Sequence, residues 1–371
     1  MDIVINRLKA DPREASVEFV ECKCCGHPDT ICDLVCENAG KALAAYYEKC
    51  FGNILHYNID KALLVAGTAI PKWNGGKIVK PARLIIAGRA TAKVGTRQVP
   101  VERIIKESAR KTLSSFKRAK IDVKVMTAPG SANLAQIFSD KKRDLAVAND
   151  TSFGCAHYPA TRLEVLVLAI RDFLYSANFR KRFPQVGDDI KIMALRDKNK
   201  KEVTLAIAFI DNFFSSVAEY AAVKNELELL LSKKFNVLLK INTLDDYESG
   251  VGGVYLTVTG LSCEMGDDGQ VGRGNRYDGL ITPNQPMSLE AIAGKNDNHP
   301  GRAYQVAAYK IAEAVVKKGG AKFASVQMLT DIGAPLRKPK VVAVSLIGEA
   351  NNGKVKAGKV KAAVRSVMQN L

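Results

Sequence analysis

The sequence predicts an α+β fold, and three observations support this prediction. The chain has 371 residues, of which 47% are hydrophobic, enough to bury a large core and to form more than one domain. Segments in which apolar residues alternate, as in strands, lie between segments in which apolar residues recur at helical spacing. A pair of strands with a long helix recurs about three times, which indicates a modular architecture.

The first strong patterns are a strand over residues 15–20, a turn at 26–29 and a helix over 29–49, in which Ile31, Leu34 and Val35 begin the helical periodicity. Alternation predicts further strands over residues 54–57, 62–67, 83–92, 122–126, 189–195, 203–210, 236–241, 254–258, 323–329 and 341–346. Helical spacing predicts further helices over residues 100–117, 160–179, 215–234, 302–318 and 359–369.

The first turn has the sequence GHPD at residues 26–29. Pro28 suits the first helical turn, where its missing N–H leaves no hydrogen bond unmade. A helix N-terminus attracts anions through free N–H groups and the positive end of the helix dipole, and His27 can add a donor to a phosphate oxygen. Asp29 can cap the helix or bind a metal ion. Taken alone, the tetrapeptide favours a capping Asp preceded by a structural His.

A glycine-rich acidic loop, GDDGQVGRGN, occupies residues 266–275. Its four glycines within nine residues let the backbone bend and approach a ligand closely. Arg273 offers a planar set of donors for phosphate oxygens, and Asp267 and Asp268 can hold magnesium or a cationic or hydroxyl-bearing ligand. The loop therefore predicts a magnesium–polyphosphate substrate. A flexible acidic surface loop is the alternative that composition alone leaves open.

Together the two segments resemble S-adenosylmethionine synthetase (methionine adenosyltransferase), in its archaeal-type branch. The similarity continues in ANDTSFG at 148–154, VGDDIK at 186–191, INTLDDY at 241–247, YLTVTG at 255–260, EMGDDGQVGRGNR at 264–276, GLITP at 279–283, PMSLE at 286–290 and AGKN at 293–296. The order and spacing of these segments hold from about residue 15 to about residue 330. A collinear match of this length is far more specific than any one motif.

The resemblance implies three similar β/α subdomains around a pseudo-threefold axis, with boundaries near 1–130, 131–250 and 251–371 and with segments exchanged between them. It implies that the methionine sulfur attacks C5′ of ATP to give S-adenosyl-L-methionine, and that the triphosphate is then hydrolysed to pyrophosphate and phosphate. Magnesium is the implied cofactor. Potassium activation is known in the family, but the sequence offers no ligand for that ion. Family members are homodimers whose active sites lie at the interface.

The resemblance also implies a role for individual residues. His27 would contact the triphosphate near the bond that breaks, Lys191 would face the phosphates, and Arg273 would clamp them. The implied catalytic residues are His27, Lys191, Arg273 and Lys295. The implied ATP-binding residues are His27, Gly130, Ser131, Asn133, Asp189, Lys191, Arg273 and Lys295. The implied substrate-binding residues are Asp150, Asp267, Asp268 and His299, and the implied metal ligands are Asp29 and Asp268.

The sequence departs from the family pattern at Ala128, Asn133 and residues 155–158. These departures leave a second hypothesis open, an ATP- or polyphosphate-handling enzyme that does not depend on methionine. His157 lies in the last departure and is either a surface or core histidine or a ligand contact.

The formal net charge of +17 raises nucleic acid and membrane surfaces as partners. The basic clusters at 106–124, 196–201 and 354–361 lack interleaved aromatic residues and RNA-binding signatures, so we interpret them as solvated surface that attracts anionic ATP. Neither a nucleic acid nor a membrane partner is expected. No apolar run approaches about 20 residues, and residues 1–12 contain no apolar signal segment, so a cytoplasmic location is expected.

Five of the eight cysteines lie within residues 22–36, but their C-x-C-C-x6-C-x3-C spacing fits no common zinc pattern. Cys32 and Cys36 are one helical turn apart and are expected in the core. The segment GEANNGK at 348–354 resembles a P-loop but is followed by Val355, where a Ser or Thr would bind magnesium. No Gly-x-Gly-x-x-Gly run follows a predicted strand, so a dinucleotide site has no support.

Overall fold

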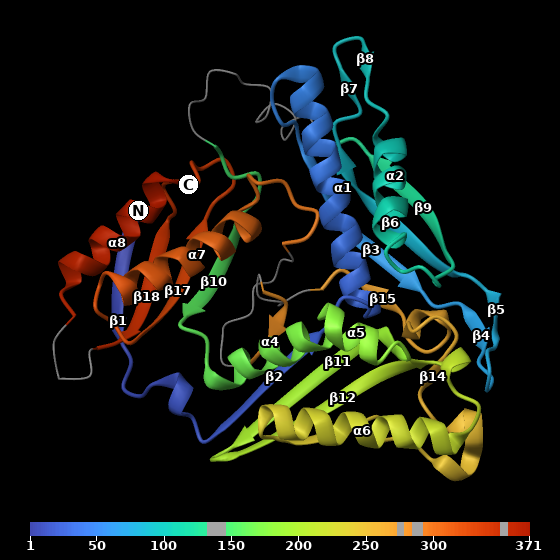
Figure 1. Cartoon of the computed structure of the whole chain (residues 1–371). Helices are drawn as coiled ribbons and strands as arrows, with labels where there is room; N and C mark the ends of the chain where they lie inside the picture. Colours follow the sequence, from blue (N-terminus) through green and yellow to red (C-terminus); the bar gives the residue numbers. More distant parts are fainter. Residues whose placement is uncertain (132–145, 273–277, 284–291, 349–354) are drawn as a thin grey trace.

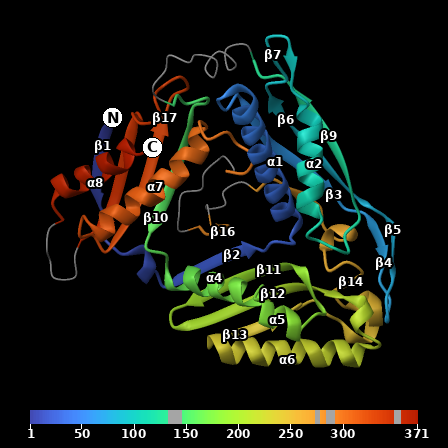
Figure 2. The ribbon, with the colours of Figure 1, turned by 45° about the horizontal axis from the view of Figure 1, so that its top comes forward.

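Three mixed sheets, each covered by helices on one face, form a roughly triangular molecule (Figures 1 and 2). The computed structural model describes residues 1–131, 146–272, 278–283, 292–348 and 355–371. The predicted α+β class is confirmed. None of the helices in these ranges is both long enough and apolar enough to span a bilayer.

The first sheet has the strand order β15-β3-β6-β9, and the helices α1 and α2 pack against it. Its core joins Ile31, Val35 and Leu43 of α1 to Leu64 and Ile86 of the strands. The bounds are α1 (Pro28–Phe51), β3 (Tyr57–Val65), β6 (Ala82–Ala90), α2 (Val101–Leu113), β9 (Ile121–Ala128) and β15 (Gly269–Gln270).

The second sheet has the strand order β13-β12-β11-β2-β16, with β14 added beside β12. Helices α4, α5 and α6 contribute to its core. The bounds are β2 (Val17–Lys23), α4 (Arg162–Leu174), α5 (Ala177–Arg182), β11 (Val186–Asp197), β12 (Lys200–Ile210), α6 (Val217–Phe235), β13 (Leu238–Ile241), β14 (Leu256–Thr257) and β16 (Leu280–Ile281).

The third sheet has the strand order β1-β18-β17-β10, with α7 and α8 packed against it. The bounds are β1 (Asp2–Arg7), β10 (Ser152–Tyr158), α7 (Pro300–Lys317), β17 (Phe323–Thr330), β18 (Val341–Ile347) and α8 (Ala357–Gln369). Two short hairpins complete the strands: β4 (Thr68–Ile70) with β5 (Lys77–Lys80), and β7 (Lys93–Val94) with β8 (Arg97–Gln98).

The three sheets share one topology. A helix leads into an antiparallel strand pair, a second helix follows, and a parallel strand closes the unit: α1-β3-β6-α2-β9, α4-β11-β12-α6-β13, and α7-β17-β18-α8 with β1. The first strand of each unit also pairs antiparallel with a strand that precedes a helix of another unit. These pairs are β3 with β15, β11 with β2, and β17 with β10. The division into residues 1–130, 131–250 and 251–371 stays a prediction, and these pairings identify the strands that cross between the units.

Two predicted elements were wrong in detail. The strand expected over 54–57 is absent except for Tyr57, where β3 begins. The helix expected over 160–179 is two helices, because Ser176 accepts a hydrogen bond from the N–H of Phe179 and caps a new helix, α5. The P-loop-like segment at 348–354 lies almost entirely outside the described residues.

Candidate active site

The GHPD turn joins β2 of the second sheet to α1 of the first. Gly26 donates its N–H to the carbonyl of Asp188 (3.0 Å), and a side chain at this position would collide with the same carbonyl. His27, rather than Asp29, caps α1, because its Nδ1 atom accepts the N–H of Asp29 (3.2 Å). Pro28 occupies the first helical turn as predicted. The interpretation of Asp29 as the helix cap was therefore wrong.

The capping bond determines which nitrogen of His27 carries a proton. An Nδ1 atom that accepts a hydrogen bond leaves the proton of the neutral ring on Nε2. Burial lowers the pKa of His27 below its usual value, so the ring is neutral at pH 7. The Nε2 atom lies 3.7 Å from a carboxylate oxygen of Asp267. His27 therefore holds an N–H donor at the positive end of the α1 dipole.

Asp29, freed from capping, bridges three segments of the chain. Its carboxylate accepts hydrogen bonds from Nζ of Lys23 (2.6 Å) and from the N–H of Gln270 (2.9 Å). Burial acts to raise the pKa of Asp29, but these hydrogen bonds and the charge of Lys23 outweigh it, so the pKa is lowered. Asp29 is therefore ionised at neutral pH and can bind a cation.

The acidic loop lies directly against this turn. Asp268 accepts the N–H of Ala66 (2.7 Å), which attaches the loop to the end of β3, and a side chain at Gly269 would collide with the backbone of Pro28. Asp267, whose side chain is 55% exposed, stays open toward His27. Arg273 and the rest of the loop through residue 277 lie outside the described residues.

Asp189 of β11 is buried behind this cluster. Its Oδ2 atom accepts hydrogen bonds from the backbone N–H (3.0 Å) and the hydroxyl of Ser262. Burial raises the pKa of Asp189 to about 6, and the charges of Asp267 and Asp29 add to the rise, whereas the hydrogen bonds from Ser262 oppose it. Three carboxylates thus approach one another, which makes this end of α1 a place where bound cationic charge is favourable.

Lys191 lies two residues further along β11. Its ammonium forms an ion pair with Glu21 of β2 (2.9 Å), and its charge contributes to the lowered pKa of His27. Lys191 therefore belongs to the same group as His27, Asp29, Asp189 and Asp267, which we call the α1 cluster.

The raised pKa of Asp189 predicts a stability that depends on pH. The folded state binds this proton more tightly than the unfolded chain, so ionisation of Asp189 destabilises the fold as the pH rises from about 4 to above 6. Asp189→Asn stays neutral and can still accept a hydrogen bond from Ser262. We expect the unfolding free energy of this variant, relative to wild type, to increase by about 2–3 kcal/mol as the pH rises from about 4 to 8. Urea denaturation at both pH values measures this gain. Asp188→Asn, which removes the neighbouring, more exposed carboxylate, is the matched control, and an equal gain there would contradict the assignment.

A second cluster surrounds Lys295, whose side chain is only 2% exposed. The Nζ atom of Lys295 donates to Asp60 of β3 (2.6 Å), and Lys61 donates to the same carboxylate (2.6 Å). A shift in register between Asn58 and Lys61 lets the consecutive residues Asp60 and Lys61 both avoid the core face of β3. Burial acts to raise the pKa of Asp60, but the charge of Lys295 lowers it to about 2.

The helix α7 begins beside Lys295 in the same way as α1. His299 is its N-cap, with Nδ1 accepting the N–H of Gly301 (3.0 Å), and its Nε2 atom lies 3.2 Å from a carboxylate oxygen of Asp150. Arg302, one turn further, forms a bidentate ion pair with Glu37 of α1. We call Lys295, Asp60, His299 and Asp150 the β3 cluster.

An open cavity of about 820 Å³ contains the β3 cluster, and it is lined by Asn58, Asp60, Lys61, Ala87, Gly88, Arg89, Glu102, Val125, Met126, Thr127, Ala128, Asp150, Lys295 and His299. Gly130 lies two residues beyond this wall, where a side chain would crowd Nδ1 of His56 at 2.7 Å. Ser131 follows it on the surface, and Asn133 lies outside the described residues. The departure at Ala128 thus lies on the cavity wall.

β3 connects the two clusters. Leu64 and Leu63 pair with Gly269 and Gln270 of the acidic loop, and Asn58 forms an isolated bridge with Lys295. Five residues of strand span about 17 Å at roughly 3.3 Å per residue. The predicted residues therefore form two groups at the two ends of one strand.

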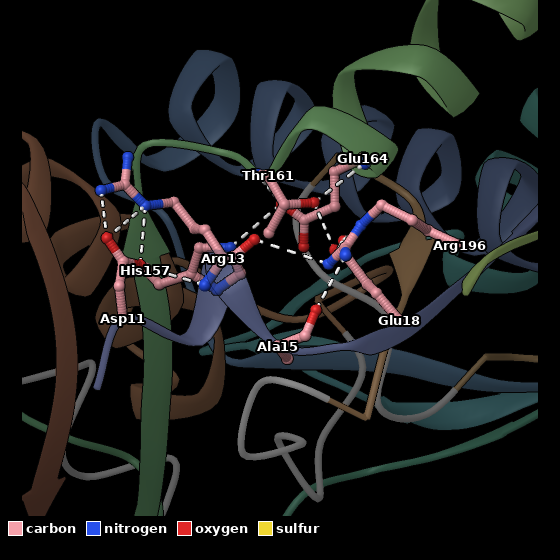
Figure 3. Close-up of polar contacts among 8 residues, drawn as sticks. All are labelled: Asp11, Arg13, Ala15, Glu18, His157, Thr161, Glu164 and Arg196. Carbon is pink, nitrogen blue, oxygen red and sulfur yellow. Dashed lines mark hydrogen bonds and ion pairs between the residues drawn. The ribbon is translucent and has the colours of Figure 1, made fainter. Parts of the chain in front are cut away.

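His157 belongs to neither cluster. It is buried in β10, where Nε2 lies 3.0 Å from a carboxylate oxygen of Glu164 (Figure 3). Its ring packs on Phe323. Glu164 also accepts the N–H of Thr161 in the capping box of α4. The core interpretation of His157 is confirmed, and with buried Cys155 it places the departure at 155–158 mainly in the interior.

The cysteine prediction is confirmed for Cys32 and Cys36, which are fully buried in the core of the first sheet. Cys22 and Cys24 are buried and Cys25 is exposed, and all three are free thiols. Within the part of the chain that the structure describes, no three His, Cys, Asp or Glu side chains form a ready metal site.

Lys23, Asp60 and Ser262, which hold Asp29, Lys295 and Asp189, were not predicted from the sequence. Nor was the capping of two helices by histidine side chains in the same way. The signal was present as a repeated His-Pro dipeptide, at residues 27–28 and 299–300, each at the start of a predicted helix.

The chain is similar to known proteins along nearly its whole length. A family model described as S-adenosylmethionine synthetase (AdoMet synthetase) matches residues 1–371. S-adenosylmethionine synthases from Methanocaldococcus jannaschii and Saccharolobus solfataricus are 40% and 42% identical over 370 and 367 residues, covering 94% of this chain and 90% and 89% of those proteins. The protein of that name from Haloquadratum walsbyi is 38% identical over 367 residues, covering 95% and 90%. An unusual S-adenosylmethionine synthetase from Campylobacter jejuni shares the fold, with a TM-score of 0.62, 17% identity, and coverage of 95% and 86%.

Proposed function

The chain belongs to the S-adenosylmethionine synthetase family, and we propose that the α1 and β3 clusters supply the residues with which it makes S-adenosylmethionine from methionine and ATP. The observation that carries this assignment is the neutral His27 at the N-terminus of α1, with its Nε2–H free of the capping bond and with Asp29 and Asp267 beside it.

The reaction needs positioning and charge stabilisation more than proton transfer. The methionine sulfur is a nucleophile without deprotonation: its lone pair forms the S–C5′ bond while the C5′–O bond breaks, and the triphosphate leaves with the bonding electrons. Negative charge then grows on the leaving oxygen. A donor from His27 at a helix N-terminus, with Lys191 as the cation in the same cluster, stabilises that charge. Lys295, at the other end of β3, would reach a shared active site from the second copy of a dimer. Arg273 adds to this set by the family resemblance.

The α1 cluster also suits magnesium. Magnesium is commonly held by one or two carboxylates together with substrate phosphates rather than by a complete protein cage. Asp29 and Asp267 offer such oxygens, and Lys23 already places a cation against Asp29. We propose Asp29 as a metal ligand, with Asp268 contributing the oxygen that Ala66 does not occupy. Bound magnesium would neutralise charge on the triphosphate. Potassium dependence is proposed from the family alone.

We further propose that the enzyme cleaves the triphosphate before release, adding water to give pyrophosphate and phosphate. We expect chromatography of a reaction with ATP, methionine, magnesium and potassium to show S-adenosylmethionine, pyrophosphate and phosphate in equal amounts. Omission of magnesium should abolish turnover, whereas omission of potassium should only slow it. ATP breakdown that is independent of methionine would contradict the proposal and support the polyphosphate-handling alternative.

The open sheet faces support a homodimer. In the second sheet, the exposed side chains of Phe19 (β2) and Met193 (β11) point away from the helices. In the first sheet, the exposed side chains of Leu63 (β3) and Met126 (β9) do the same. Apolar side chains gathered on open sheet faces mark an interaction surface. We propose that these faces pair two copies of the chain, which would bring residues of both copies to each active site.

A charge on this face should separate the copies. We expect Phe19→Glu, at a position 47% exposed, to weaken the dimer about 100-fold or more, because the carboxylate would be buried without a partner. Sedimentation equilibrium measures the dissociation constant, and activity should fall with the dimer fraction. Leu229→Glu, at a position 73% exposed on α6, is the control for the same change on another face. A wild-type chain that sediments as a monomer would refute the proposal.

A further inference from the structure

A basic crevice opens where the second and third sheets meet. Its volume is about 600 Å³, and it is lined by Asp11, Arg13, Glu14, Ala160, Arg162, Arg196, Lys198, Asn199 and Lys201. These residues come from the connection between β1 and β2, which includes the 3-10 helix η1 (Pro12–Glu14), from the start of α4, and from the β11–β12 hairpin. Five basic and two acidic side chains leave an excess of three positive charges.

Two of the basic side chains are held in place (Figure 3). Arg196 donates to Glu18 of β2 (3.0 Å) and to the carbonyl of Ala15 (2.8 Å), and Thr161 donates its hydroxyl to the same Glu18. Arg13 donates from Nε and Nη2 to Asp11. These two bonds leave the Nη1 group of Arg13 as a donor for a bound anion. The walls of the crevice are therefore preorganised.

The other three cations have no counter-ion in the described part of the chain. Arg162, Lys198 and Lys201 form no ion pair with any residue that the structure describes. Lys201 is directly opposite Arg196 in the β11–β12 ladder, so two positive charges lie side by side, and of the two only Arg196 has a counter-ion, Glu18, among the described residues. Arg162 occupies the first turn of α4, where its charge adds to the positive end of the helix dipole instead of opposing it.

This crevice is separate from the α1 cluster. Arg196 lies five residues beyond Lys191 on β11, about 17 Å along the strand at roughly 3.3 Å per residue. Arg196 also alternates with Leu195 and shares the helix-covered face of buried Ala194, so it points away from the open face that carries Met193.

We propose that this crevice binds a small polyphosphate anion of about the size of pyrophosphate. Several cations that converge without counter-ions suit a compact, multivalent anion better than a single carboxylate. None of the described residues that line the crevice is aromatic, so they offer no surface on which a base would stack, and the two acidic side chains disfavour an extended nucleic acid backbone. The free anion and the phosphate chain of a nucleotide share this chemistry. The site is independent of the assignment of the catalytic residues.

The test is isothermal titration of the full-length protein with inorganic pyrophosphate at physiological ionic strength. We expect wild type to bind pyrophosphate at one site per chain beyond the active site, and Lys198→Glu/Lys201→Glu to lose that site, with affinity about 100-fold weaker. The matched control is Lys200→Glu/Lys240→Glu, which makes the same change in net charge at exposed positions outside the crevice. S-adenosylmethionine synthesis should be unchanged in both variants.

Competition then identifies the source of the anion. If ATP displaces pyrophosphate from the crevice, the phosphate chain of a nucleotide occupies the site. If ATP does not displace it, the site takes the free anion. Equal stoichiometry in all three proteins, or equal loss in the control, would overturn the proposal. Circular dichroism melting of each variant verifies that the fold is intact.

Discussion

Replacement of His27 by asparagine is expected to lower kcat about 100-fold to 1,000-fold while leaving the free energy of unfolding nearly unchanged. Asparagine is among the best N-cap residues, so its side-chain oxygen can accept the N–H of Asp29 in place of Nδ1. The shorter side chain cannot also place a donor where Nε2 now lies, near Asp267. Loss of one preorganised donor to a developing oxyanion costs about two to three orders of magnitude in rate.

His27→Ala separates the two roles of the residue. Alanine removes both the cap and the donor, so kcat should fall as far as in the asparagine variant while unfolding becomes easier by about 1 kcal/mol. Steady-state kinetics with varied ATP, together with urea denaturation, measures both effects. If the asparagine variant kept near-normal kcat, the donor role of His27 would be excluded, and its place in the motif would be explained by capping alone.

The sequence predicted the parts of this site that depend on neighbours along the chain. The strand, the turn and the start of α1 around Pro28 follow from local periodicity and from the fixed φ angle of proline. The choice of cap was not local: Asp29 is a better intrinsic N-cap than His, but Lys23 and Gln270 engage its carboxylate, and Gln270 is 241 residues away. The side chain of His27 therefore caps the helix in place of Asp29.

Long-range partners were beyond prediction for the same reason. Asp60 and Lys295 are separated by 235 residues, and Asp189 and Ser262 by 73, so no local pattern pairs them. The threefold topology was predicted by the family resemblance and by the recurrence of strands and helices, but the residue identities themselves show no repeat. The hydrophobic core of each unit requires only apolar residues at the correct spacing, which many different sequences supply.

Two of the strands that were missed have partners far away in the sequence. β1 and β10 complete the third sheet from the N-terminal half of the chain, and neither was predicted. β10 contains Gly154, where a side chain would collide with the backbone of Tyr304, and such a glycine weakens a strand pattern in the sequence. Its place in the sheet depends on the pairing with β17 rather than on its own propensity.

The second large effect is expected at Lys295, whose replacement by methionine should lower both turnover and stability. Among the described residues, the variant leaves buried Asp60 with Lys61 alone as its counter-ion, and the side chain of Lys61 is 56% exposed and therefore screened. Unfolding should become easier by about 2–4 kcal/mol at pH 7. If Lys295 contacts the phosphates, kcat should also fall about 100-fold or more, because methionine offers no donor.

The pH dependence shows whether the lost stability comes from Asp60. In wild type the charge of Lys295 holds the pKa of Asp60 at about 2, so this carboxylate stabilises the fold above about pH 4, and the contribution is lost as the pH falls toward 2. In Lys295→Met the burial that Lys295 had outweighed should raise the pKa of Asp60. The difference in unfolding free energy between the two proteins should therefore be largest above about pH 4 and shrink below it.

A second substitution separates structure from catalysis at this pair. Asp60→Asn in the Lys295→Met background removes the unpaired charge, so most of the lost stability should return, while kcat should stay low because the cation is still missing. Recovery of both stability and turnover would mean that Lys295 serves only to neutralise Asp60. Recovery of stability alone would identify the ammonium as a participant in the reaction, since Asp60 would then be the counter-ion that keeps a buried lysine charged and in place beside the cavity.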